Sequence, residues 1–236
     1  MREPELPLGG GWVTGGVVRV GETVRRPIGS NAPLVHALLR HLEEVGFDAA
    51  PRLLGLDEEG REVLTFVEGS VPSDCRSMVW EDRQLASSAK LLRRFHDATA
   101  GSELAGPNEV VRHNDFGPWN LLWRKGLPAA IIDFDEAAPG ERLDDLGYAI
   151  WKHLNLGLID LAPAEQRRRI GVMRSAYDAA PAADVVAAIA RAQERMQQKL
   201  DAGPASDGRT AALAQLDGER GWLEADGEEP GEPSSS

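Results

Sequence analysis

Residues 113–120 read HNDFGPWN, and residues 131–135 read IIDFD. The first stretch carries an acid, Asp115, and an amide, Asn120, while the second is a short apolar run that leads into another acid, Asp133. Phosphoryl transfer needs one carboxylate to orient and deprotonate the acceptor hydroxyl, and oxygen ligands to hold Mg²⁺ on the nucleotide phosphates. We therefore predict that Asp115 is the catalytic base and that Asn120 and Asp133 are metal ligands.

The spacing of these residues predicts how the chain brings them together. Gly117 and Pro118 break any regular structure and predict a tight loop. Residues 120–123 and 129–132 are apolar runs joined by the turn-forming sequence RKGLP, which is typical of a hairpin. A hairpin of this kind returns Asp133 to the loop that holds the first acid and the amide.

The pattern His-x-Asp-x-x-x-x-Asn followed by Ile-Asp-Phe-Asp resembles the catalytic signature of the aminoglycoside phosphotransferase family, whose relatives include choline and homoserine kinases. Residues 144–147, DDLG, resemble the start of a helix in that family. The resemblance covers most of the chain from Val17 to Trp222, but only residues 113–147 carry specific motifs. It implies an α+β, bilobal protein-kinase-like fold, with a reduced β-rich N-terminal lobe and a mainly helical C-terminal lobe.

The same resemblance implies transfer of a phosphoryl group from ATP or GTP, assisted by Mg²⁺, to a hydroxyl of a small molecule. Two features point away from a protein substrate. Asn114 stands where protein kinases usually carry Arg, and residues 134–143 are too few for a regulatory activation segment.

Periodicity along the chain predicts the elements around this signature. Residues 17–26 and 53–67 read as hairpins, and residues 32–45 carry the apolar spacing of an amphipathic helix. Residues 68–72 read as a link between lobes. Further helices are expected over 81–98, from Asp145 through His153, and over 163–179, 182–200 and 208–225. We therefore divide the chain into a nucleotide-binding lobe at 1–69, a catalytic lobe at 70–226 and a disordered acidic tail at 227–236.

The N-terminal lobe departs from the family pattern. By its position in the first hairpin, Arg25 matches the basic residue that contacts the phosphates, with Arg26 as the alternative. The backbone near Val67 would receive the base of the nucleotide, a role that rests on the resemblance alone. The acidic partner expected on the following helix is missing, because Val35 or His36 falls there.

Glycines at 9–11 and 15–16 could form a phosphate loop, but few residues precede them, and flexible chain is the simpler interpretation. Among supporting residues, His113 is expected to pack against the turn at Asp133 rather than to bind metal. Asp135 either assists a second metal or caps its turn. Asp145 is either a helix N-cap or, as the resemblance implies, a brace for the catalytic loop.

Composition sets outer limits on function. The chain has 236 residues, of which 42% are hydrophobic, and one cysteine, Cys75. Without an internal disulfide, an apolar signal core or a membrane-length apolar run, a cytoplasmic protein with no membrane partner is expected. A net charge of −12 argues against nucleic acid and fits a cationic acceptor such as an amino sugar, although many of the acids lie in the C-terminal segment.

Two other functions are compatible with parts of this pattern. A catalytically degenerate kinase-like protein could give immunity to a toxin or antibiotic by binding it, and the missing helix acid favours that interpretation. A hydrolase using Asp115 and Asp133 as paired carboxylates would explain neither Asn120 nor the hairpin. The sequence identifies neither the acceptor, nor ATP against GTP, nor the oligomeric state.

Overall fold

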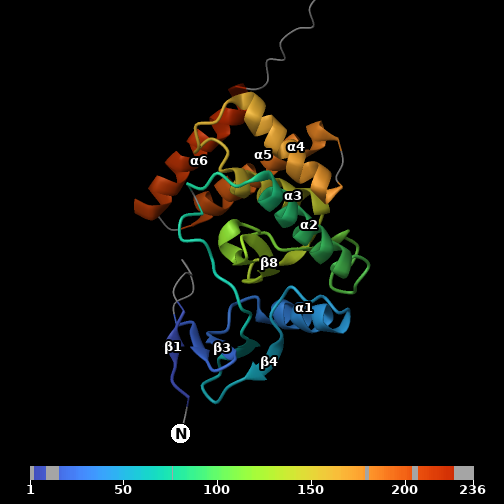
Figure 1. Cartoon of the computed structure of the whole chain (residues 1–236), viewed down its shortest axis with the longest axis vertical. Helices are drawn as coiled ribbons and strands as arrows, with labels where there is room; N and C mark the ends of the chain where they lie inside the picture. The colour runs from blue at the N-terminus through green and yellow to red at the C-terminus, as the bar shows by residue number, and fades with distance from the viewer. Residues whose placement is uncertain (1–2, 9–15, 76, 179–180, 204–206, 226–236) are drawn as a thin grey trace, which may run out of the picture.

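The computed structural model describes residues 3–8, 16–75, 77–178, 181–203 and 207–225, and these form two stacked lobes (Figure 1). A β-sheet with one helix makes the N-terminal lobe, and helices with two short antiparallel strand pairs make the C-terminal lobe. The mixed α+β, kinase-like architecture expected from the sequence is therefore present.

The N-terminal lobe is built on one antiparallel sheet. Its strands run in the spatial order β1-β2-β3-β5-β4. The strands are β1 (Leu6–Pro7), β2 (Val18–Val20), β3 (Thr23–Arg26), β4 (Leu53–Leu56) and β5 (Glu62–Thr65). Both predicted hairpins form. The first closes at Gly21, whose φ of 55° suits a two-residue hairpin turn that glycine adopts at little cost.

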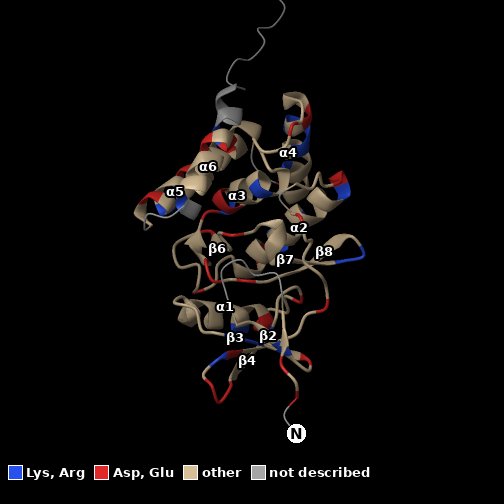
Figure 2. Cartoon of the chain, turned by 90° about the vertical axis from the view of Figure 1, so that its left-hand side faces the viewer, with Lys and Arg blue, Asp and Glu red and all other residues tan. Residues whose placement is uncertain are grey.

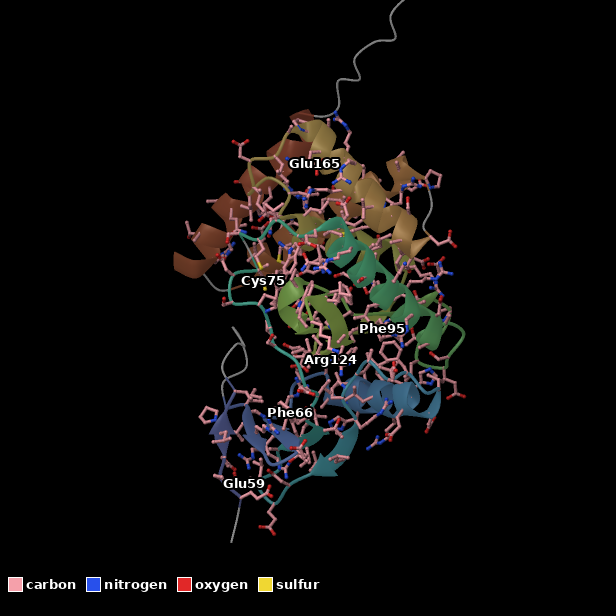
Figure 3. All side chains as sticks on the ribbon, in the orientation of Figure 1. Glu59, Phe66, Cys75, Phe95, Arg124 and Glu165 are labelled. Atoms are coloured by element: carbon pink, nitrogen blue, oxygen red, sulfur yellow. The ribbon has the colours of Figure 1, made fainter. Side chains whose placement is uncertain are left out.

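Helix α1 (Ala32–Glu44) joins the sheet lobe to the rest of the molecule. Its apolar stripe, which includes Val35, Leu38 and Leu42, is buried in a core that continues into the helical lobe. Just after α1, the ring centroid of Phe47 lies 6.2 Å from that of Phe95. Phe95 belongs to helix α2 (Asp82–Thr99) and is labelled in Figure 3. The two lobes therefore share apolar core at α1 in addition to the covalent link.

The C-terminal lobe places one hairpin and one pair of sequence-distant strands between its helices and the sheet lobe. Strands β6 (Val110–Arg112) and β9 (Ala138–Gly140) pair, as do β7 (Leu121–Arg124) and β8 (Leu127–Ile131), with a 3-10 turn η1 (Pro118–Asn120) before β7. The helices are α2 (Asp82–Thr99), α3 (Arg142–Leu154), α4 (Pro163–Tyr177), α5 (Ala182–Ala202) and α6 (Asp207–Ala225). The predicted β7–β8 hairpin and the helices are confirmed, with bounds shifted by a few residues.

Two local features differ from the sequence expectations. Helix α3 begins at Arg142 with Glu141 at its N-cap, so Asp145 lies inside the first turn and the N-cap interpretation is wrong. The β6–β9 pair was not predicted, because its strands are only three residues long and far apart in sequence. Gly147 lets α3 and α5 approach closely, since a Cβ there would lie 2.5 Å from the backbone of Ala188.

Within the described residues, no helix combines the length and apolar character that crossing a bilayer requires. Basic and acidic residues are interspersed over both lobes rather than gathered by sign (Figure 2). The predicted glycine cluster at 9–11 and Gly15 lies outside the described residues, as does the tail at 226–236.

Candidate active site

The loop between β6 and η1 is fixed by His113, which is fully buried. Its Nδ1 lies 3.3 Å from the backbone N of Asp115, and its Nε2 lies 3.1 Å from the carbonyl oxygen of Ile132. An N–H donor on one side and a carbonyl acceptor on the other define the tautomer with the proton on Nε2. The ring also packs 5.0 Å from that of Phe134, so its contacts are those of an architectural histidine.

Asp145 holds the start of this loop from inside α3. Its Oδ2 accepts the backbone N–H of His113 at 2.7 Å, and its Oδ1 accepts that of Asn114 at 2.9 Å. His96 Nε2 lies 3.0 Å from Oδ2, and His96 Nδ1 lies 2.5 Å from the hydroxyl of Tyr177. Asn114 has a φ of 62°, a left-handed conformation that asparagine tolerates. The carboxylate of Asp145 thus accepts hydrogen bonds from two backbone N–H groups at a strained turn.

The carboxylate of Asp115 is held by three donors. Tyr148 of α3 donates its hydroxyl to Oδ1 at 2.5 Å, and Asn120 donates its amide to Oδ2 at 2.8 Å. Trp119 Nε1 lies 3.4 Å from Oδ2. An ionised carboxylate has about four lone-pair sites, so these contacts orient Asp115 and leave it able to accept one more hydroxyl. Burial and the charge of Asp115 raise the pKa of Tyr148 well above its usual value, so Tyr148 stays a donor.

Sequence reasoning missed Tyr148. The aromatic residue is four positions after Asp144 on a helix that the motif already located, but helical spacing does not reveal which loop residue a side chain will contact.

The β7–β8 hairpin brings Asp133 beside Asn120. The backbone N of Ile132 donates to the carbonyl oxygen of Asn120 at 2.9 Å, so Asp133 follows immediately after this contact. Asp133 has a φ of 62°, an uncommon conformation that turns the chain sharply at this acid. Partial burial and then the charge of Asp135 raise the pKa of Asp133, although Arg26 acts in the opposite direction.

This set of donors fits a hard cation. The side-chain N–H₂ group of Asn120 donates to Asp115, so the amide oxygen of Asn120 remains available to bind a cation. Burial first and the carboxylate of Asp135 second raise the pKa of Asp133, and a divalent cation bound there would favour its ionised form. One amide oxygen and one carboxylate from the protein would leave the rest of a cation's shell to water and phosphate oxygens, as Mg²⁺ prefers.

Arg25 and Arg26 occupy opposite faces of β3, because successive side chains of a strand alternate. Arg25 bonds Thr23 Oγ1 at 2.6 Å and lies 3.7 Å from Asp57, away from the catalytic loop. Arg26 is buried and directs its Nη1 to Asp133 at 3.4 Å and its Nη2 to Asp135 at 2.5 Å. Of the two basic residues considered from the sequence, Arg26 is therefore the one beside the predicted metal ligands.

The acid missing from the helix is supplied by another element. Glu62 of β5 is 1% exposed and accepts a hydrogen bond from Arg26 Nε at 2.5 Å. Its second oxygen lies 2.7 Å from Nε2 of His36, which stands on α1 at the position where the family pattern led us to expect an acid. The register of the sheet explains why Glu62 takes the place of the expected helix acid, since Arg26 pairs directly with Glu62 across β3 and β5. In the sequence this pair is marked only by two ordinary strand patterns, which do not reveal their register.

The remaining predicted residues lie at the junction between the lobes. Asp135 contacts Arg26, and its backbone oxygen accepts a hydrogen bond from the side chain of Asn31 at 3.0 Å. Val67 follows β5 in the inter-lobe link, and its backbone finds no hydrogen-bond partner among the residues that the structure describes. These positions are compatible with the roles expected of them.

A small cavity of about 40 Å³ lies next to Trp119, between η1, α3 and α6. Its lining includes Trp119, Trp151, Lys152, Asn155, Gln215 and Glu219. Trp119 lines this cavity and also places its Nε1 3.4 Å from Oδ2 of Asp115.

Comparison with known proteins agrees with this geometry. Residues 102–184 match the model of the phosphotransferase enzyme family. The trifolitoxin immunity protein of Rhizobium leguminosarum bv. trifolii is 37% identical over 170 residues, an alignment that covers 65% of this chain and 63% of that protein. The chain thus spans less than two thirds of the length of this curated relative.

Solved structures share the fold at low identity. A choline/ethanolamine kinase family protein from Mesorhizobium loti aligns with a TM-score of 0.63 and 18% identity, over 94% of this chain and 88% of that one. A GDP complex of aminoglycoside 2'-phosphotransferase-IIIa aligns with a TM-score of 0.57 and 14% identity, over 96% of this chain and 93% of that one. A macrolide 2'-phosphotransferase from Brachybacterium faecium aligns with a TM-score of 0.55 and 15% identity, over 85% of this chain and 87% of that one. The chain therefore shares the kinase-like fold of these solved structures, and its residues 102–184 match the model of the phosphotransferase enzyme family.

Proposed function

We propose that this protein transfers a phosphoryl group from ATP or GTP to a hydroxyl of a small molecule, with Asp115 as the base. The arrangement around Asp115 carries the proposal. Tyr148 and Asn120 hold its carboxylate at 2.5 and 2.8 Å, while Asp145 pins the loop that presents it. Structural neighbours crystallised with GDP and ADP support a nucleotide donor.

In this proposal each group of the site has one task. Asp115 accepts the hydrogen bond of the acceptor hydroxyl and takes its proton as the oxygen attacks the terminal phosphorus, whose bond to the bridging oxygen breaks to release the nucleoside diphosphate. Asn120 and Asp133 would hold Mg²⁺, which would supply positive charge to the phosphate oxygens. The backbone at Val67 receives the base of the nucleotide, and His113 fixes the geometry between Asp115 and the turn that carries Asp133.

We assign the contact with the phosphates to Arg26 rather than to Arg25. Three carboxylates, those of Glu62, Asp133 and Asp135, surround the Arg26 guanidinium. Burial alone lowers the pKa of Arg26, but these acids, Asp135 foremost, raise it above its usual value, so the group remains charged. Glu62 can keep hold of Nε while the two terminal nitrogens turn to phosphate oxygens, a geometry that the planar fork of arginine permits.

Replacing each arginine in turn tests this assignment. Arg26→Met should weaken the binding of a non-hydrolysable nucleotide with Mg²⁺ by about tenfold or more, because it removes a charge-assisted contact to phosphate. Arg25→Met is the matched control and should stay within about twofold. Calorimetric titration gives both affinities. If Arg25→Met is the variant that loses affinity, the role belongs to Arg25.

Because Arg26→Met leaves the buried carboxylate of Glu62 without its partner, its melting temperature must be measured beside its affinity. Arg26→Lys keeps the charge and serves as the second variant. It should fold, and it should bind nucleotide more weakly than the wild type because it lacks the fork.

A second function deserves testing because of one finding, the similarity to the trifolitoxin immunity protein. We propose as the alternative that the chain protects its host by binding a toxin or antibiotic without modifying it. In that case protection survives the loss of Asp115. Growth of cells expressing wild type or Asp115→Asn, challenged with a panel of peptide toxins and aminoglycosides, separates the two functions.

A further inference from the structure

The buried carboxylate of Glu62 divides its two oxygens between two partners. Its Oε2 accepts the hydrogen bond of Arg26 Nε, and its Oε1 lies 2.7 Å from Nε2 of His36. An ionised carboxylate only accepts hydrogen bonds, so His36 Nε2 is the donor in this contact. Because Glu62 is 1% exposed, these two donors are what compensate its burial.

The contact with His36 determines which nitrogens of Arg26 remain free. An arginine and a carboxylate that meet alone favour two parallel hydrogen bonds, for which Nε and one terminal nitrogen are a suitable pair of donors. Among the contacts that the structure describes, Glu62 takes only Nε, because its other oxygen is held by His36. Both terminal nitrogens of Arg26 therefore extend past Glu62, to Asp133 at 3.4 Å and to Asp135 at 2.5 Å.

Helix α1, which carries His36, is attached to the same turn as the far end of Arg26, at the boundary between the lobes (Figure 1). Asn31, at the N-cap of α1, donates from Nδ2 to the backbone oxygens of Asp135 at 3.0 Å and of Ala137 at 2.9 Å. His36 follows on the same helix, so its position relative to that turn is set by the helix backbone. The contacts from α1 to the turn, to Arg26, to Glu62 and back to α1 thus form a closed ring.

We propose that His36 is a positioning residue for the phosphate contact, and that by holding one oxygen of Glu62 it keeps both terminal nitrogens of Arg26 available to the nucleotide. Without His36, the free oxygen of Glu62 can turn to a terminal nitrogen of Arg26, which leaves a single terminal nitrogen for phosphate. The proposal rests on the proposed function in one respect, the assignment of the phosphate contact to Arg26. The helix then supplies a donor that orients an acid of the sheet, where the family pattern has an acid on the helix itself.

Calorimetric titration of a non-hydrolysable nucleotide with Mg²⁺ into variants of His36 tests this role. His36→Leu removes the donor and should weaken nucleotide binding by about fivefold or more, because one charge-assisted contact to phosphate is lost. His36→Gln places an amide N–H near the position of Nε2 and should stay within about twofold of the wild type. His41→Leu is the matched control on the same helix. His41 bonds the backbone oxygen of Ala98 at 2.8 Å, so its loss should also change nucleotide affinity by no more than about twofold.

A double-mutant cycle shows whether His36 acts through Arg26. In the Arg26→Met background, His36→Leu should change the affinity by no more than about twofold, because the nitrogens that it positions are gone. A role in stability alone would give the same loss in both backgrounds. Melting temperatures are measured for every variant, since His36→Leu leaves a buried oxygen of Glu62 without its donor. If His36→Leu does not fold, His36→Asn replaces it with the same expected loss, because its shorter side chain does not reach Glu62.

Wild-type nucleotide affinity in the folded variant that lacks the donor would overturn the proposal. So would an equal loss of affinity in the Arg26→Met background, or a loss in His36→Gln as large as that in His36→Leu. Unchanged affinity in Arg26→Met would overturn both the assignment of the phosphate contact to Arg26 and the role of His36. None of these titrations depends on turnover, so a failure of the phosphotransferase activity is seen separately, in transfer assays on wild type and Asp115→Asn.

Discussion

Asp115→Asn is expected to lower turnover with the true acceptor by about 10²-fold or more, while nucleotide affinity stays nearly constant. The amide keeps the size of the carboxylate and can still accept the hydroxyl of Tyr148, but it cannot take a proton. Transfer assays against a panel of hydroxylated acceptors, paired with calorimetric titration of nucleotide and Mg²⁺, separate chemistry from binding.

Asp48→Asn is the matched control, since Asp48 lies on the surface and pairs only with Arg94 among the described residues. It should leave both quantities unchanged. Measurable wild-type turnover that survives Asp115→Asn would remove Asp115 from the chemistry. If neither protein transfers phosphate and both protect cells against the same toxin, sequestration is the better account.

Asp145→Ala is expected to lower the free energy of unfolding by about 3–5 kcal/mol, because it strips the partners from buried donors. The backbone N–H groups of His113 and Asn114 would lose their acceptor, and so would the ring of His96. Urea unfolding of wild type and variant measures the loss. Asp48→Ala serves as the exposed control and should cost no more than about 1 kcal/mol.

The stabilisation that Asp145 contributes to the folded protein should also depend on pH. Burial alone raises the pKa of Asp145, but the hydrogen bond from His96, the electrostatic influence of the His96 and His113 rings and the backbone N–H of His113 hold it below its usual value. A carboxyl whose pKa is lower in the folded state stabilises the protein fully above its unfolded pKa of about 3.9, and the stabilisation is lost as the pH falls through the folded pKa. The difference in the free energy of unfolding between wild type and Asp145→Ala should therefore be largest near neutral pH and should decrease below about pH 4. A difference in unfolding free energy that does not change with pH would show that the carboxylate is not ionised in the native protein.

The sequence by itself determined the elements and the core of the site. The hairpins at 17–26, 53–67 and 120–132 and the amphipathic helices follow from apolar periodicity and turn residues, both of which act over a few positions. The placement of Asp133 next to Asn120 follows equally from a short hairpin, whose register a tight turn fixes. Local rules suffice because each of these contacts closes a small loop of chain.

Only the tertiary structure decided which side chains meet across long separations. Arg26 finds Glu62 on β5 rather than an acid on α1, Tyr148 reaches Asp115 from α3, and Lys152 meets Glu219 from α6. A periodic pattern tells which face of a helix or strand is buried, but it does not tell what lies opposite that face. Those partners depend on sheet register, on helix packing and on the close approach of α6 to the turn after α3. All three result from burying the shared core as a whole, and no single segment of the sequence encodes them.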